Sequence, residues 1–333
     1  MKKILITGAS GFIGSFIVEE TLRQGYDVYA AVRKSSSREY LQDERINFVE
    51  LNLGSTEQLT SQLQDLQPDY VVHAAGVTKC IDRSQFFKVN TEGTRHLVDA
   101  LKTVWGGRED TRLVFISSLS IFGAIREEQP YTEILDTDTP RPNTAYGESK
   151  LQAEKIVQAS GLNFVILRPT GVYGPREKDY FLMAKSIKQH SDFSVGYKPQ
   201  DITFVYVSDV VQAVMKALHA DAALGKAYFL SDGEVYRSVA FSDLIHEELG
   251  RPWIIRIKAP IWLLHIITTL GDHYGRLTHT ISALNNDKYH ILRQRNWRCD
   301  ISPARRDLGY DPQVQLAQGV KESIQWYKEN KWL

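Results

Sequence analysis

The chain has 333 residues, of which 43% are hydrophobic and 24% charged, which is typical of a globular protein able to bury a full core. Forty basic residues balance forty acidic ones, which argues against a nucleic-acid-binding protein, because such proteins carry a basic patch. The two cysteines, Cys80 and Cys299, have no metal-binding or redox spacing and predict reduced thiols in a cytoplasmic protein.

The apolar segments predict a soluble chain with no transmembrane segment. The N-terminal stretch MKKILITG has too few apolar residues for a signal peptide. The longest apolar run, 259–271, is shorter than the roughly 20 residues that span a bilayer. We therefore expect at most a contact with a membrane surface.

Short β-branched runs alternate with helical segments over the first 170 residues. We expect strands at 4–7, 27–32, 46–51, 70–75, 113–117 and 164–169, and helices at 12–24, 56–66, 84–105 and 144–159. The strand runs are continuously apolar rather than alternating, which predicts a parallel sheet covered on both faces. The fold class is therefore α/β, a doubly wound parallel sheet (Rossmann) with a smaller mixed C-terminal substrate lobe.

The pattern loosens after about residue 170. We expect a dinucleotide-binding domain over 1–170, with 202–223 and about 297–312 returning to it. Segments 171–201 and 224–296 would form the substrate lobe. The tail 313–333 predicts a closing amphipathic helix.

The first strand is followed at once by a glycine loop. ILITGASGFIG places Gly8, Gly11 and Gly14 between the strand and the mouth of the first helix. This spacing is a variant of the dinucleotide-binding fingerprint: it allows a tight turn, a close backbone approach to a pyrophosphate, and close packing of helix on strand. A bare turn is the alternative interpretation.

The end of the second strand bears on which dinucleotide binds. An acidic residue there favours NAD, whereas a basic one pairs with the 2′-phosphate of NADP. AAVRKSSS has no carboxylate but offers Arg33 and Lys34, so we expect NADP(H) to be favoured over NAD(H). The alternative is that both are solvated loop charges.

The stretch TAYGESK places Tyr146 and Lys150 on one face of a helix. Alone, this pair is also typical of an ordinary surface. Ser118, at the end of the fifth strand, would reach the same crevice. Lys150 would lower the pKa of the Tyr146 phenol, Tyr146 would exchange a proton with a substrate hydroxyl, and Ser118 would orient that oxygen. We expect Gly147 to leave room beside the cofactor.

Several blocks then occur together in a fixed order. They are TGASGFIG, HAAG (73–76), SSLSIFG, YGESK, LRPTGVYGP (167–175) and VYVSDVV (205–211). Over nearly the whole chain they resemble the extended short-chain dehydrogenases/reductases, the NAD-dependent epimerase/dehydratase family. The resemblance implies a catalytic triad of Ser118, Tyr146 and Lys150. It implies cofactor contacts from Gly8, Gly11, Phe12, Ile13, Gly14, Asn52, Leu53, Ala74, Ala75, Gly76, Tyr146, Lys150, Pro169 and Val172.

The chain departs from the family pattern at a few positions. Phe122 stands where tyrosine is usual, and we expect little effect. Members acting on nucleotide sugars have an asparagine where this chain has Gly171 and an arginine where it has Ile202. With the apolar run 259–271, these departures resemble the dihydroflavonol reductase and 3β-hydroxysteroid dehydrogenase branches, although the run also fits an ordinary core helix. Arg176 and Lys178 are candidate anion contacts, so a phosphorylated substrate stays an alternative.

The leading hypothesis is an NAD(P)-dependent oxidoreductase acting on a secondary alcohol or ketone of a small, fairly apolar molecule. The alternatives are a nucleotide-sugar epimerase or dehydratase with tightly bound NAD, and a catalytically silent dinucleotide-binding sensor or assembly subunit. The resemblance also implies a homodimer through the helices at 90–105 and 145–160. We expect no metal site.

Overall fold

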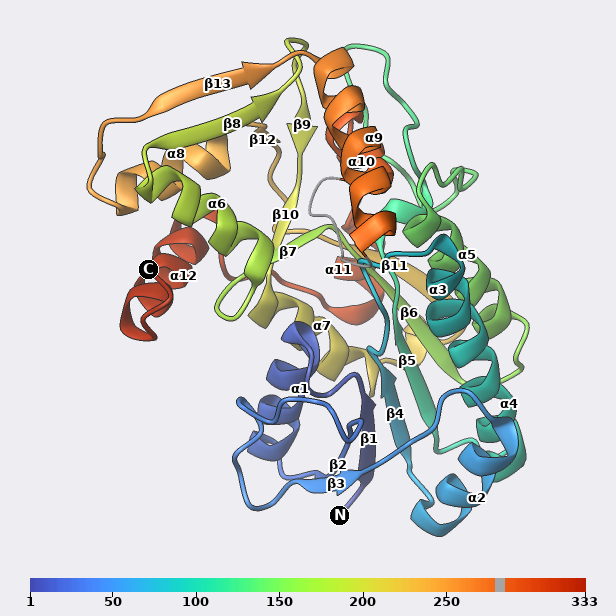
Figure 1. Cartoon of the computed structure of the whole chain (residues 1–333). Helices are drawn as coiled ribbons and strands as arrows, with labels where there is room; N and C mark the ends of the chain where they lie inside the picture. The colour runs from blue at the N-terminus through green and yellow to red at the C-terminus, as the bar shows by residue number, and fades with distance from the viewer. Residues whose placement is uncertain (279–284) are drawn as a thin grey trace.

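The computed structural model describes residues 1–278 and 285–333 and consists of a seven-stranded parallel sheet with a smaller lobe at one end (Figure 1). The strands in spatial order are β11 (Lys226–Leu230), β6 (Phe164–Pro169), β5 (Arg112–Ile116), β4 (Tyr70–His73), β1 (Lys3–Thr7), β2 (Asp27–Ala31) and β3 (Asn47–Val49). This reversal of strand order on either side of β1 confirms the doubly wound fold.

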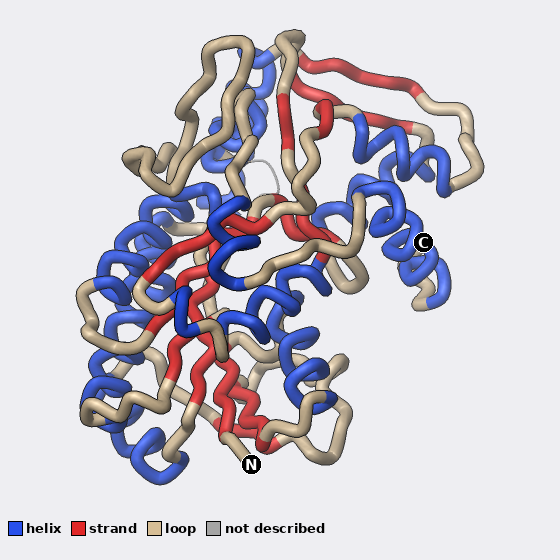
Figure 2. The backbone as a smooth tube through the Cα atoms, turned by 180° about the vertical axis from the view of Figure 1, so that it is seen from behind, coloured by secondary structure: helices blue, strands red, loops and turns tan. Residues whose placement is uncertain are grey.

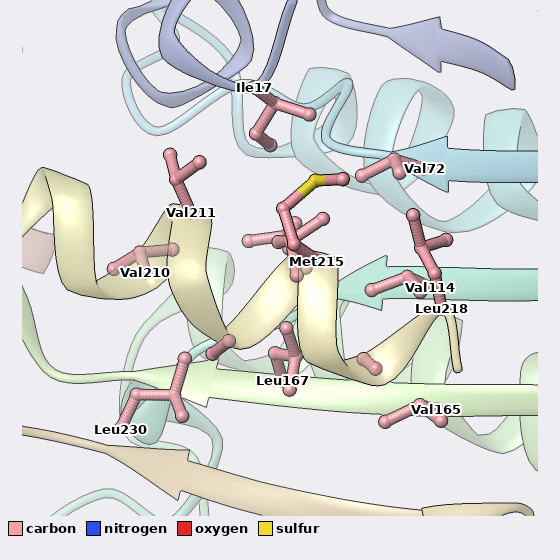
Figure 3. Close-up of a cluster of buried hydrophobic side chains, with 14 of the residues drawn as sticks. Ile17, Val72, Val114, Val165, Leu167, Val210, Val211, Met215, Leu218 and Leu230 are labelled. Atoms are coloured by element: carbon pink, nitrogen blue, oxygen red, sulfur yellow. The ribbon is translucent and has the colours of Figure 1, made fainter. Parts of the chain in front are cut away.

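Helices cover both faces of the sheet, as the continuously apolar strands predict. On one face α1 (Phe12–Arg23) packs against α7 (Val207–Ala217). In Figure 3, Val210, Val211 and Met215 of α7 lie over Val72, Val114, Val165 and Leu167 of the strands. On the other face lie α2 (Thr56–Leu66), α4 (Gly93–Trp105) and α5 (Ala145–Gln158).

Three short irregular elements lie between the strands and helices of this domain. The predicted helix at 84–105 consists of α3 (Arg83–Phe86), a π-helical turn (Phe87–Glu92) and α4. A 3₁₀ turn, Leu119–Ile121, follows β5. A second 3₁₀ turn, Asp221–Ala223, precedes β11.

The lobe contains three two-stranded sheets and most of the C-terminal helices (Figure 2). The strand pairs are β7 (Gly171–Tyr173) with β10 (Phe204–Tyr206), β9 (Asp201–Ile202) with β12 (Tyr236–Arg237), and β8 (Ser191–Val195) with β13 (Ile255–Ala259). The helices are α6 (Lys178–Lys188), α8 (Ala240–Glu248), α9 (Ile261–Thr278), α10 (Asn286–Arg293) and α12 (Leu316–Glu329). The remaining helix, α11 (Ser302–Leu308), packs against β11 and α7.

The expected boundary between domain and lobe needs one correction. The strand at 202–207 does not return to the main sheet, because β10 pairs with β7 instead. The strand that joins the sheet beside β6 is β11, inside the segment assigned to the lobe. Both runs are short and apolar, so their composition does not say which neighbour each will pair with. The helix α7 after β10 does cover the sheet.

Candidate active site

The glycine loop connects β1 to α1, and its shape explains its glycines. Gly8 has φ +70°, and a Cβ there would lie 2.7 Å from the carbonyl carbon of Ala74. A Cβ on Gly14 would lie 2.1 Å from the carbonyl oxygen of Gly8. The first glycine therefore lets the loops after β1 and β4 approach each other, and the last lets α1 pack on the loop.

The loop and the N-terminus of α1 fit a pyrophosphate group. The cap residue of α1 is Gly11, whose amide donates to the carbonyl of Gly8 at 2.9 Å. No described side chain caps this helix, so the amides of its first turn, including those of Phe12 and Ile13, are left for an anionic ligand. The residues present thus fit NAD(P).

The other predicted cofactor residues follow the C-terminal ends of neighbouring strands. Arg33 and Lys34 are exposed after β2, and Asn52 is exposed after β3. The Asn52 side chain accepts from the amide of Gly54 at 3.0 Å, and Leu53 beside it is partly buried. The remaining residues lie after β4 (Ala74, Ala75, Gly76) and at and beyond the end of β6 (Pro169, Val172). In a parallel sheet these positions share one edge.

Ser118 and Tyr146 are brought together at this same edge. Ser118 caps the 3₁₀ turn after β5; its Oγ accepts from the amide of Ser120 and donates to the Ser120 hydroxyl, both at 3.1 Å. The Ser118 hydroxyl lies beside Tyr146 and acts to lower the pKa of the phenol. Burial is the larger effect, so the pKa of Tyr146 is raised.

Lys150 lies one turn further along α5 and is buried. Its Nζ donates to the backbone carbonyl of Ile116 at 2.6 Å and lies 4.2 Å from the centre of the Phe115 ring. Burial lowers the pKa of the ammonium to about 7, while the charge of Glu154 opposes this shift. The expected lowering of the Tyr146 pKa by Lys150 therefore stays a prediction for the cofactor-bound protein.

The structure explains the glycine at position 147 by packing against the turn after Ser118, whereas we expected it to leave room for the cofactor. A Cβ at this position would lie 2.4 Å from the backbone carbonyl oxygen of Ser120. The glycine thus lets the first turn of α5 pack directly on the turn that follows Ser118. Gly147 thus sets the distance between the segments that carry Ser118 and Tyr146. This packing alone accounts for a glycine at the position.

His73, the first residue of the HAAG block, and Asn90 support the site, although no sequence pattern predicts their contacts. The ring of His73 is hydrogen-bonded to the hydroxyls of Thr7 at 2.7 Å and Thr94 at 2.9 Å, which ties β1, β4 and α4 together. Burial, with a smaller contribution from the Lys150 charge, lowers the pKa of His73 to about 3. Asn90, in the π-helical turn, accepts from the amide of Val77 at 2.8 Å and donates to Ser149 Oγ on α5 at 3.0 Å.

Asp287 is a site residue that sequence reasoning missed. It lies on α10 of the lobe, and its carboxylate accepts the backbone amides of Ala145 at 3.1 Å and Tyr146 at 3.2 Å. Thr144, the cap residue of α5, accepts the amide of Gly147 at 3.0 Å. Two separate segments therefore cap the helix that carries Tyr146.

A cavity of about 380 Å³ opens beside this helix. Its walls come from the segment after β4, from α3, from the start of α5 and from α9–α10. Polar residues in the walls include Arg83, Asp272, His273, Asn285 and Asp287. The cavity thus lies between the Rossmann domain and the lobe, with Ala145, next to Tyr146, in its wall.

Neither a membrane-spanning helix nor a metal-binding cluster occurs among the described residues. Among residues 1–278 and 285–333, no helix combines the length and the hydropathy that crossing a bilayer requires. The same ranges hold no group of His, Cys, Asp or Glu side chains placed to bind a metal ion. Cys80 and Cys299 are both free thiols.

The fold and the glycine loop define a dinucleotide-binding protein of the doubly wound α/β class. The model of the NAD dependent epimerase/dehydratase family matches residues 4–230, and the chain belongs to this family. The curated relatives of this chain include an epimerase and a dehydrogenase/isomerase.

Two relatives and one solved structure illustrate this range. UDP-glucose 4-epimerase of Vibrio cholerae is 27% identical over 346 residues, covering 97% of this chain and 95% of the relative. The 3 beta-hydroxysteroid dehydrogenase/Delta 5→4-isomerase of Mycobacterium tuberculosis is 25% identical over 353 residues, covering 98% and 90%. The crystal structure of dTDP-glucose 4,6-dehydratase from Bacillus anthracis in complex with NAD has a TM-score of 0.78 at 20% identity, covering 100% of this chain and 98% of that one. This last likeness concerns the fold.

Proposed function

We propose that this protein is an NAD(P)-dependent oxidoreductase that interconverts a secondary alcohol and a ketone of a small, fairly apolar substrate. The observation that carries the proposal is the placement of Ser118 beside the half-buried phenol of Tyr146 at the edge of the sheet where the glycine loop lies. A hydroxyl pair of this kind, beside a dinucleotide site, is equipped to bind and deprotonate a substrate hydroxyl.

Each residue of the triad then has one role. Tyr146 takes the proton of the substrate hydroxyl in oxidation and returns a proton to the carbonyl oxygen in reduction. Ser118 donates to that oxygen and orients it. Lys150, fixed on the Ile116 carbonyl, supplies positive charge behind the phenol when it is protonated. NAD(P), when bound at the glycine loop, supplies the hydride acceptor or donor.

The surroundings of Gly171 support an apolar substrate. A Cβ on Gly171 would lie 2.8 Å from the Tyr180 hydroxyl and 3.3 Å from the Phe204 ring, so the asparagine found in nucleotide-sugar enzymes has no room there without movement. Ile202 is partly buried against the aromatic core of the lobe, where an arginine would be expected in those enzymes. The carboxylates of Asp272 and Asp287 in the cavity wall would also repel a diphosphate.

We further propose that the cofactor is NADP(H) in preference to NAD(H). Arg33 and Lys34 are exposed at the end of β2, where a 2′-phosphate would lie. The nearest carboxylate to Lys34 in the described salt bridges is that of Glu50, at 4.0 Å and itself exposed, so little desolvation or competition opposes a phosphate. The dehydratase structure from Bacillus anthracis contains NAD, so the preference of this chain for NADP(H) is a question for cofactor titration.

A substrate panel tests the proposal. Calorimetry with UDP- and dTDP-sugars should show weak or undetectable binding, because Ile202 replaces the arginine that would pair with a buried diphosphate. NADPH oxidation should be measurable with apolar ketones such as ketosteroids or flavonoid-like carbonyls. Micromolar binding of a UDP-sugar without ketone turnover would instead support a nucleotide-sugar epimerase or dehydratase. The Vibrio cholerae relative is an epimerase of this kind.

A further inference from the structure

A buried ion pair lies one helical turn beyond Lys150 on α5. Glu154 is 1% exposed, and its carboxylate accepts from Arg168 Nη2 at 2.7 Å and from Arg168 Nε at 3.0 Å. Arg168 belongs to β6 and is itself 6% exposed. The pair therefore joins the helix that carries Tyr146 and Lys150 to the strand that ends at Pro169.

The guanidinium of Arg168 is surrounded by apolar rings. It lies 5.3 Å from the ring centre of Phe122 and 5.6 Å from that of Phe229. Phe122 has a ring but no hydroxyl, and among the described residues the guanidinium donates to Glu154 alone. Each charge of the pair therefore depends on the other for compensation.

Stability alone is a weak reason for this pair. Replacing a buried ion pair with apolar side chains is often neutral or stabilising, because the cost of desolvation offsets the attraction between the charges. Positions 150 and 154 are four residues apart, so their side chains are neighbours on α5. Arg168 thus fixes a carboxylate next to the buried ammonium of Lys150.

The ammonium of Lys150 has no closer anion in the described part of the chain. Its Nζ donates to the uncharged carbonyl of Ile116, and it forms no salt bridge with a described carboxylate. Burial lowers the pKa of Lys150 to about 7, and the negative charge of Glu154 opposes this shift. The protonation of Lys150 near neutral pH is therefore sensitive to the charge at position 154.

The other described groups that face Lys150 are uncharged near pH 7. His73, on β4, has its pKa lowered to about 3 and is neutral. Tyr146, on the same helix, has a raised pKa and keeps its proton. The π-helical turn contacts α5 through the neutral side chains of Asn90 and Thr91. The ion pair is therefore the fixed charge next to the lysine.

We propose that Glu154 and Arg168 are positioning residues that set the charge of Lys150: Glu154 favours the protonated lysine, and Arg168 limits how strongly it does so. Both act through Lys150. The inference rests on the proposed function, in which a protonated Lys150 supplies positive charge behind the Tyr146 phenol. It extends that function to the groups that determine how much of the lysine is charged.

The ionisation of Lys150 tests this directly and needs no substrate. In a chain labelled with ¹³C at the lysine Cε atoms, the Lys150 signal is assigned by its loss in Lys150→Met, and its midpoint should lie near pH 7. Glu154→Gln leaves the Arg168 cation alone and should lower this midpoint by about 1 pH unit or more. Arg168→Met leaves the Glu154 anion alone and should raise it by a similar amount. Unchanged midpoints, or shifts of the same sign, would overturn the proposal.

Two further variants complete this test. Glu154→Gln/Arg168→Met leaves neither charge buried, so it should fold even where a single variant does not, and its midpoint should lie below that of the wild type. An unchanged midpoint in this variant would also overturn the proposal. Arg112→Met is the control: Arg112 is another buried arginine, at the opposite end of β5, where it donates to the carbonyls of Ala217 and Ala220, both at 3.2 Å. Its loss should leave the Lys150 midpoint unchanged.

The pH profile of turnover separates this inference from the proposed function. With a ketone that the protein reduces, kcat should fall as the pH rises through the Lys150 midpoint, because the lysine loses its charge. This alkaline limb should move to lower pH in Glu154→Gln and to higher pH in Arg168→Met. A limb that stays fixed while the Lys150 midpoints move would support the pair as the control of the lysine charge and contradict the use of that charge in the proposed reaction.

Discussion

The carboxylate of Asp287 accepts the backbone amide of Tyr146 at 3.2 Å, across 141 positions of the sequence. This contact joins α10 of the lobe to the first turn of the helix that presents the proposed proton donor. Asp287 also lines the cavity. A ligand in the cavity would therefore lie next to the residue that fixes the first turn of α5. We infer that Asp287 is a positioning residue.

The first prediction concerns this contact. Asp287→Ala removes an acceptor for two amides and should lower the free energy of unfolding by about 1 kcal/mol, the usual value of a helix cap. It should also reduce kcat by about tenfold through displacement of Tyr146, with little change in KM for the cofactor. Asp287→Asn keeps one carbonyl oxygen as acceptor and should recover much of the rate.

Ser55→Ala is the matched control for this change. Ser55 caps α2, where its Oγ accepts the amide of Gln58, far from the tyrosine. It should lose a similar amount of stability and retain kcat. Equal effects of both alanine variants on kcat would rule out a positioning role for Asp287.

The second prediction concerns the cofactor. Arg33→Ala/Lys34→Ala should weaken NADPH binding by about tenfold or more, because a charge-assisted hydrogen bond to phosphate contributes about 1.5–3 kcal/mol. Binding of NADH should be almost unchanged. Fluorescence titration of both cofactors measures this. Equal affinities of the wild-type protein for NADH and NADPH would refute the assignment.

The third prediction concerns pH. The pKa of His73 is lowered to about 3 in the folded chain but is near 6.5 when unfolded, so the unfolded chain binds more protons between these values. The stability contributed by neutral His73 is complete above pH 6.5 and is lost as the pH falls toward 3. Between pH 6.5 and 4.5 the loss should be about 2 kcal/mol.

Urea unfolding at several pH values separates this contribution from that of other groups. His73→Gln retains a donor and an acceptor for Thr7 and Thr94 but does not titrate. The variant should show a shallower decline of unfolding free energy below pH 6.5. Parallel curves for the two proteins would mean that His73 is not the titrating group.

The fourth prediction concerns Gly147. An added Cβ would meet the Ser120 carbonyl at 2.4 Å, and backbone on both sides prevents easy adjustment. Gly147→Ala should therefore destabilise the chain and reduce turnover, although alanine normally favours a helix by about 1 kcal/mol. Gly93→Ala in α4 is the control, since its Cβ would be 3.6 Å from Leu53 and should be tolerated. Unaffected turnover in Gly147→Ala would contradict the importance of this spacing.

Local sequence patterns predicted the sheet and most of the proposed site, because both depend on short-range signals. The apolar runs of β1, β4 and β5 and the spacing of Tyr146 and Lys150 are visible within a few residues. The pairing of β10 with β7, and of β11 with β6, depends on tertiary packing, so the sequence placed 202–207 in the main sheet and 226–230 in the lobe, whereas the structure has the reverse. The contact of Asp287 with Tyr146 joins segments far apart in sequence, and no local pattern marks it.

The exposure of α9 could not be predicted for a related reason. Its run of apolar residues predicts a helix, but the run alone does not say whether neighbouring elements cover both sides. In the folded chain Leu264 is buried, whereas Trp262 and Leu270 face outward. Only the position of the lobe around the helix decides which of its faces is buried and which is exposed.

Turnover by Tyr146→Phe tests the central claim most directly. The substitution removes the phenol hydroxyl but keeps the ring, including its contact with Phe86, whose ring centre is 6.3 Å away. With a ketone that the wild-type protein reduces, single-turnover NADPH oxidation should fall by about 10²-fold or more, while NADPH affinity and the unfolding midpoint stay unchanged. Near-normal turnover by a folded, cofactor-binding Tyr146→Phe protein would contradict the proposed mechanism.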